Sequence, residues 1–127
     1  MVYRGSAHEK AFLNAVSEQI DCDNKMTAAL YLLTADRLLW SKARRCICNS
    51  QIHFSAVNLG NTSPEAYALF MTAMDLYKGT RHITLSDIAD RELISHKMFE
   101  LIVNAMAIRR YGADAVAIIS KGGGVRC

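Results

Sequence analysis

The chain has 127 residues, of which 51% are apolar and 21% are charged, and its formal net charge is +3. This length suits one domain, and the balance of apolar and charged residues is that of a folded globular protein. No segment has the roughly 20 apolar residues that a membrane span needs, and the N-terminus lacks the apolar core of a secretory signal. We therefore expect no membrane association and a location in the cytoplasm.

Apolar residues recur at helical spacing in the first third of the chain, over 7–20 and again over 25–47. Ser6 and Glu9 have the spacing of a capping box, so we expect Ser6 to cap the first helix. Thr34-Ala35-Asp36 offers a fresh cap inside the second segment and can divide it into two helices. The sequence thus predicts two or three helices before Cys48.

The helical signal fades after Cys48. Residues 51–57 have the apolar content of a short strand or an extended loop, and residues 114–119 that of a strand or one more helix. If both segments are strands, they can form one short pair.

The second half of the chain has clear helix boundaries. Ser63-Pro64 is typical of a helix start, and Gly79 is typical of the left-handed residue that ends a helix. Thr84 can cap a short helix, and Ser95 can cap a last long helix over 96–111. These boundaries predict three further helices.

The resulting fold class is mainly α: a compact bundle of about four to six helices, with room for one short strand pair (around 51–57 and 114–119). We expect residues 1–120 to form a single helical domain. Residues 121–127 contain three consecutive glycines, and we expect them to form a flexible C-terminal tail.

The sequence contains no pattern that indicates catalysis or a cofactor. Cys46 and Cys48 form a C-x-C pair, whereas structural zinc sites use wider pairs and need a second one, so we expect free thiols and no metal. His53, Asp75 and His82 could meet in a fold, but their spacing predicts no such pair. We expect neither an enzyme nor a bound cofactor.

Two groups of side chains are candidates for binding a macromolecule. The basic candidates are Lys42, Arg44, Arg45, Arg81, His82, Arg109 and Arg110. They would form a nucleic-acid site if they converged on one face, but cations at helix ends also complement the helix dipole. The aromatic candidates are Trp40, His53 and Phe54, with Tyr3 and Tyr67 in the same patch. The alternative to a binding role, which we favour, is that Trp40 and Phe54 lie in the core.

Several motifs of the chain resemble those of a known family. They are His8-Glu9, Ala28-Ala29-Leu30-Tyr31-Leu32-Leu33, Ala73-Met74-Asp75-Leu76-Tyr77-Lys78-Gly79, Phe99-Glu100-Leu101 and Asn104-Ala105-Met106-Ala107-Ile108-Arg109-Arg110. The chain resembles a family of small uncharacterised helical proteins, a domain of unknown function, from Clostridia and related Firmicutes and their prophages. It departs from that family at Met74-Asp75, where the family has phenylalanine and asparagine. The resemblance implies a helical fold and the cytoplasm of a bacterial host, and it implies no activity.

Size, the missing catalytic motifs and this resemblance together favour one function. We expect a phage- or prophage-type accessory protein that acts by macromolecular binding, and inhibition of a host defence complex, as by an anti-CRISPR protein, is one instance. Two alternatives stay open: a nucleic-acid-binding protein that uses the Lys/Arg clusters, and a protein that binds or sequesters a small ligand. A monomer and a homodimer are equally compatible with the sequence.

Overall fold

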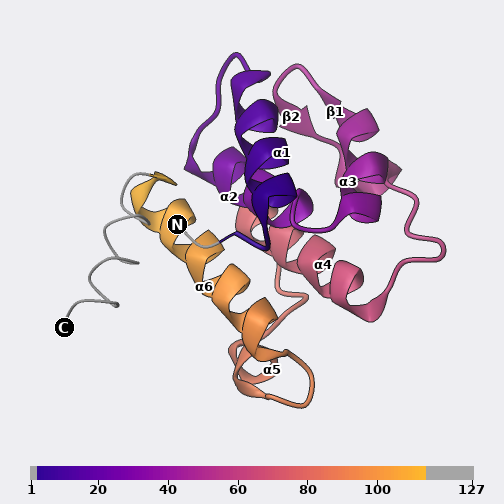
Figure 1. Cartoon of the computed structure of the whole chain (residues 1–127), viewed down its shortest axis with the longest axis vertical. Helices are drawn as coiled ribbons and strands as arrows, with labels where there is room; N and C mark the ends of the chain where they lie inside the picture. The colour runs from indigo at the N-terminus through magenta and orange to yellow at the C-terminus, as the bar shows by residue number, and fades with distance from the viewer. Residues whose placement is uncertain (1–2, 114–127) are drawn as a thin grey trace.

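The computed structural model describes residues 3–113, which form a mainly helical bundle with one short sheet (Figure 1). The mainly α prediction, with one strand pair, is confirmed. In chain order the elements are α1 (Ser6–Ser17), α2 (Asn24–Leu33), α3 (Arg37–Ala43), η1 (Arg44–Cys46), β1 (Ile47–Cys48), β2 (Gln51–Ile52), η2 (Phe54–Ala56), α4 (Pro64–Lys78), α5 (Leu85–Ala89) and α6 (His96–Tyr111).

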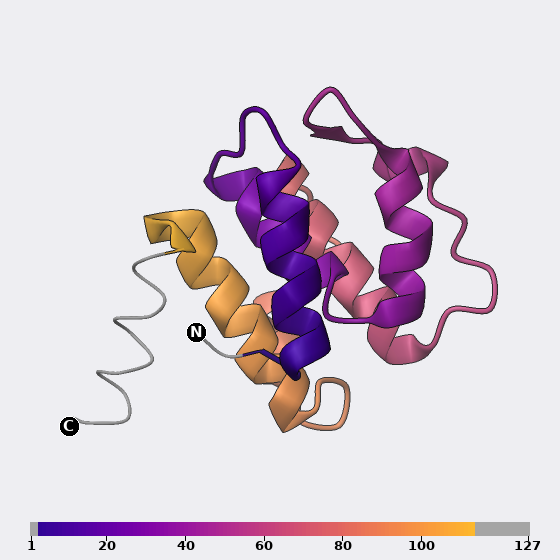
Figure 2. The ribbon, with the colours of Figure 1, turned by 45° about the horizontal axis from the view of Figure 1, so that its top comes forward.

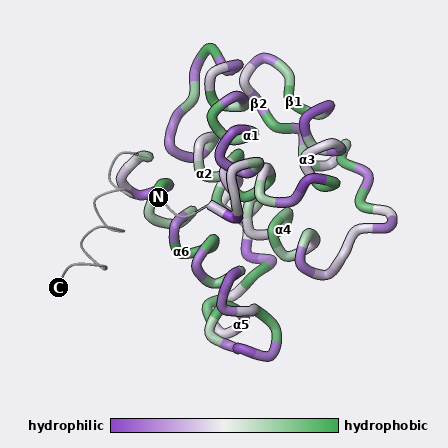
Figure 3. Tube along the Cα trace, in the orientation of Figure 1, coloured by the Kyte–Doolittle hydropathy of each residue, from purple (hydrophilic) through white to green (hydrophobic). Residues whose placement is uncertain are grey.

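Helix α2 is the centre of the bundle. Each of its residues from Met26 to Leu33 is buried, as expected for a helix that is apolar on all sides. It packs against α4 and α6, and α1 and α3 also contact it. Along the outer helices hydrophobic and hydrophilic segments follow one another closely (Figure 3), and buried residues recur at helical spacing, so each of these helices buries one face.

Side-chain caps begin most of the helices at the predicted places. Asp36 Oδ1 accepts a hydrogen bond of 2.9 Å from the Leu39 N–H, which starts α3 and confirms the division of the second apolar segment. Ser63 and Ser95 cap α4 and α6 in the same way, and Thr84 forms a capping box with Asp87 at the start of α5.

The predicted capping box at the first helix is wrong. Gly5 occupies the N-cap position of α1, and no side chain among the described residues caps this end. Instead, Nδ1 of His8 accepts a hydrogen bond of 2.9 Å from the Arg4 N–H. Ser6 is the first residue of the helix rather than its cap.

The strand pair is shorter than expected, and the strand in the 51–57 segment pairs with the strand just before it in sequence. Strands β1 and β2 pair antiparallel, with Ile47 opposite Ile52, and their two-residue turn consists of Asn49 and Ser50. Both turn residues have positive φ angles, 54° and 56°, as a type I′ hairpin requires. The rest of the 51–57 segment contains η2 rather than strand, and the segments 114–119 and 121–127 lie outside the described residues.

Within residues 3–113, no helix combines the length and the apolar character needed to cross a bilayer.

Candidate functional site

The main hollowed surface of the described residues is a groove between α1 and α3, which we call the Trp40 groove. Three adjoining hollows share the half-buried Trp40 side chain of α3, and the largest has a volume of about 430 Å³. The groove exists because α1 and α3 both pack on α2 but stand apart from each other (Figure 2). Trp40 lies at its centre.

Small residues of α1 form the wall opposite Trp40. Ala7, Ala11 and Ala15 follow one another at intervals of four residues and therefore lie on one face of α1. Ala15 is buried beneath the groove, whereas Ala7 is exposed at its edge. Methyl groups leave room beside the indole ring, so the floor of the groove is apolar.

The rim of the Trp40 groove is basic. Lys10, Arg37 and Arg44 line it, and none of them forms an ion pair with a described acidic residue. The Arg44 guanidinium lies 6.0 Å from the centre of the Trp40 ring, within the range of a cation–π contact. Glu18 is the acidic residue of the rim.

Arg4 is also basic but already has partners. Its guanidinium lies 3.3 Å from a carboxylate oxygen of Glu65 and donates a hydrogen bond of 3.4 Å to the Ala35 carbonyl. This side chain therefore joins the N-terminal segment to α4 and to the end of α2.

One end of the groove presents an apolar side chain to solvent. Ile20, in the connection between α1 and α2, is 99% exposed and lines the hollow that Trp40 and Ile47 also line. The Ser50 hydroxyl accepts hydrogen bonds from the backbone N–H groups of Ile20 (3.1 Å) and Asp21 (3.4 Å). Ser50 itself has the left-handed conformation, so a strained hairpin residue holds this connection in place.

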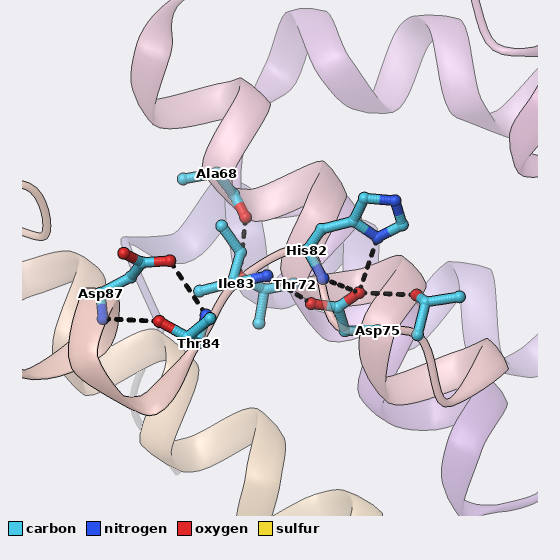
Figure 4. Close-up of polar contacts among 8 residues, drawn as sticks. Ala68, Thr72, Asp75, His82, Ile83, Thr84 and Asp87 are labelled. Atoms are coloured by element: carbon cyan, nitrogen blue, oxygen red, sulfur yellow. Dashed lines mark hydrogen bonds and ion pairs between the residues drawn. The ribbon is translucent and has the colours of Figure 1, made fainter.

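A second polar cluster surrounds Asp75 at the end of α4 (Figure 4). One carboxylate oxygen accepts hydrogen bonds from the Thr80 hydroxyl (2.6 Å), the His82 N–H (2.9 Å) and His82 Nδ1 (2.9 Å), and the other accepts from the Ile83 N–H (2.7 Å). Burial raises the pKa of Asp75, but these hydrogen bonds outweigh it and lower the pKa overall.

The Asp75 cluster orders a loop rather than a substrate site. Gly79 ends α4 with a φ of 79°, and the chain then folds back so that donors of Thr80, His82 and Ile83 surround the carboxylate. His82 donates to Asp75 through Nδ1 and its side chain is 44% exposed, pointing away from Ile83 in Figure 4. The structure thus brings together Asp75 and His82, a pair that their spacing did not predict, while His53 lies exposed elsewhere.

Two of the predicted binding residues have structural roles. Phe54 is 3% exposed and packs against Phe70 and Tyr77, with ring centres 5.5 Å apart in both cases. It therefore belongs to the core and offers no surface to a partner. Lys42 Nζ donates a hydrogen bond of 2.5 Å to the Gly60 carbonyl, which fixes the loop before α4 to α3.

The predicted basic residues do not share one face. Arg44 and Arg45 follow α3, whereas Arg109 and Arg110 lie in the last turn of α6, on the opposite side in both views (Figures 1 and 2). Arg109 Nε donates a hydrogen bond of 3.2 Å to the Leu76 carbonyl in the last turn of α4. Carbonyls at the end of a helix lack intrahelical donors and carry partial negative charge, so a cationic donor stabilises them. Arg110 stacks on Tyr111 at 5.2 Å, and Arg81 is exposed after α4.

Sequence reasoning missed the other residues of the groove: Lys10, Arg37, Ile20 and the alanines of α1. No local pattern signals them, because the groove arises from the angle between two helices that are separated in sequence by α2.

An apolar hollow of about 210 Å³ lies on another side, between α4, α5 and α6. Leu85, which is 77% exposed, and Met106 line it together with Asp75. It has no basic rim, and it offers less to a charged partner than the Trp40 groove does.

Among the described residues, no group of three or more His, Cys, Asp or Glu side chains is placed to hold a metal ion. Comparisons of the chain with family models, with curated proteins and with solved structures give no match. The resemblance to the prophage-associated family therefore stays a prediction.

Proposed function

We propose that this protein is a protein-binding module and that the Trp40 groove is its docking surface. The observation that carries the proposal is one half-buried tryptophan shared by three adjoining hollows, with a fully exposed Ile20 at one end. Tryptophan and arginine at the centre of a concave apolar surface are the residues that most often dominate protein–protein binding energy. A partner that covers Ile20 would gain the free energy of removing this apolar side chain from water.

Nucleic acid is a weaker match to the same groove. Single-stranded nucleic acid stacks its bases on open aromatic faces, but Arg44 already lies over the Trp40 ring. The other arginine clusters are too dispersed to extend the binding site along a phosphate backbone. A small ligand is a weaker match as well, because the hollows are open to solvent and would bury little of its surface.

The setting of this binding is part of the proposal and rests on the sequence alone. The family that the chain resembles points to a phage- or prophage-type accessory protein, with a host protein complex in the bacterial cytoplasm as its partner. Inhibition of a defence complex, in the manner of an anti-CRISPR protein, is the form of this idea that a plaque or plasmid-interference assay can test.

Site-specific photo-cross-linking tests the docking surface directly. Benzoylphenylalanine in place of Ile20 should give a cross-linked adduct with a partner protein in host cells. The matched control is the same residue in place of Leu93, which is 63% exposed in the connection between α5 and α6. Figure 1 places that connection at the opposite end of the molecule from the α1–α2 connection. Adducts at position 93 but none at position 20 would contradict the proposal.

A further inference from the structure

We infer that the segment of the partner that fills the Trp40 groove is acidic and inserts one apolar side chain beside Trp40. This inference rests on the proposed function, because it names the chemistry of the ligand of that same surface. It goes further by giving the ligand a sign of charge and an orientation along the groove.

The charge follows from the balance of the rim. The rim carries three cations, Lys10, Arg37 and Arg44, that have no carboxylate partner among the described residues. It carries one acidic side chain, Glu18. A basic segment would place like charges together as both surfaces lose water, which costs several-fold in affinity, whereas an acidic segment would gain complementary pairs. Arg4 illustrates the preference within the chain itself, because it lies at the same rim and is paired with Glu65.

The orientation follows from the uneven distribution of charge along the groove. The hollow at the start of α1 is lined by Arg37, which has no carboxylate partner among the described residues, and by no acidic residue. The hollow at the opposite end contains Ile20 and Ile47 together with Glu18. The acidic part of the ligand should therefore lie near Arg37, and its apolar anchor should lie between Trp40 and Ile20.

Arg44 links the two parts of this site. It lines the central hollow and the hollow at the Ile20 end, and its guanidinium lies over the Trp40 ring. A carboxylate of the ligand can pair with this guanidinium while the neighbouring apolar side chain contacts the indole. Arginine is suited to both contacts at once because its planar group stacks on a ring and also binds carboxylates through two parallel hydrogen bonds.

Selection from a random peptide library displayed on phage tests the inference and requires no identified partner. The wild-type chain should enrich peptides that carry Asp or Glu next to a large apolar residue. The double variant Lys10→Glu/Arg37→Glu should instead enrich basic peptides. The matched control is Arg91→Glu/Lys97→Glu, which reverses two exposed cations outside the groove and should enrich the same acidic peptides as the wild type.

Fluorescence then measures the affinity of one enriched acidic peptide. Trp40 is the single tryptophan of the chain, so its emission reports events in the groove. We expect the Lys10→Glu/Arg37→Glu variant to bind the peptide about tenfold more weakly than the wild type, with a difference that shrinks as salt rises. Circular dichroism of the variant should match that of the wild type, because both replaced side chains are on the surface.

Each contrary outcome has a distinct meaning. Enrichment of neutral or basic peptides by the wild type, no enrichment at all, or the same peptides from the wild type and the groove variant would overturn the acidic ligand. If cross-linking at position 20 succeeds nonetheless, the docking surface stands and only the charge of its ligand is wrong. Salt-sensitive quenching of Trp40 by an oligothymidine, together with an empty peptide selection, would overturn the inference in favour of a nucleic-acid site.

Discussion

Protonation of His8 should destabilise the folded protein as the pH falls below about 6.5. His8 is 4% exposed; its Nδ1 accepts a hydrogen bond from the Arg4 N–H, and its Nε2 lies 2.8 Å from the Tyr31 carbonyl oxygen. The geometry requires the neutral ring with its proton on Nε2, because a proton on Nδ1 would face the Arg4 N–H. The Tyr31 carbonyl lies near the C-terminal end of α2, so His8 joins α1 to that end.

The sign of the pH dependence follows from the pKa of His8. Burial lowers this pKa, as does the positive charge of Arg4, although the hydrogen bond to the Tyr31 carbonyl raises it in part. In the unfolded chain the pKa is about 6.5. The contribution of neutral His8 to the free energy of unfolding is therefore complete above pH 6.5. It is lost as the pH falls toward the lower pKa of the folded state. Within that window the free energy of unfolding should fall by up to about 1.4 kcal/mol per pH unit.

Urea unfolding at a series of pH values, followed by Trp40 fluorescence, measures this slope. His8→Gln should lower the free energy of unfolding by about 1–3 kcal/mol at pH 7.5. The Arg4 N–H loses its imidazole acceptor, and Tyr3 and Tyr31 lose the ring that they contact. It should also flatten the pH dependence of the free energy of unfolding below about pH 6.5. The control is His96→Gln, since the His96 side chain is 84% exposed. Equal slopes for wild type and His8→Gln would refute the reasoning.

Three further substitutions, two of them with a matched control, test the roles assigned above by urea unfolding. Asp75→Asn should cost about 1–3 kcal/mol at pH 7 and should remove a loss of stability that the wild type shows below about pH 4, because the folded state lowers the pKa of this carboxyl. Gly79→Ala should cost about 1–2 kcal/mol for its positive φ, whereas Gly5→Ala, an extended residue with open space around it, should be nearly neutral. Phe54→Ala should cost about 3–5 kcal/mol, and His53→Ala almost nothing; similar losses for both would contradict the burial of Phe54.

Helix boundaries were predictable because their causes lie within a few residues of sequence. Ser63, followed by a proline, has its hydroxyl within 3.1 Å of the N–H that it caps, and Gly79 ends the same helix in the left-handed conformation. The capping box at Ser6 failed for the opposite reason. His8 accepts a hydrogen bond from the Arg4 N–H, and its ring also contacts the carbonyl of Tyr31, 23 residues away, a contact that no local pattern contains.

The groove was not predictable for the same physical reason. Trp40 was recognised as a candidate, but whether it lies in the core or on the surface depends on how far α3 stands from α1. That distance is set by the packing of each helix on α2 and not by the spacing of apolar residues within either helix. Lys10 and Arg37 belong to different helices, and only the folded chain places them on one rim.

The contacts at the two ends of the groove explain why it can bind without first rearranging. At one end His8 and Arg4 hold the start of α1 to the carbonyls of Tyr31 and Ala35. At the other end the Ser50 hydroxyl holds the connection that follows α1. Because both ends of α1 are fixed relative to α2 and the hairpin, the wall that faces Trp40 is in place before a partner arrives. A preformed surface loses little conformational entropy on binding, so a groove of modest size can still support a specific complex.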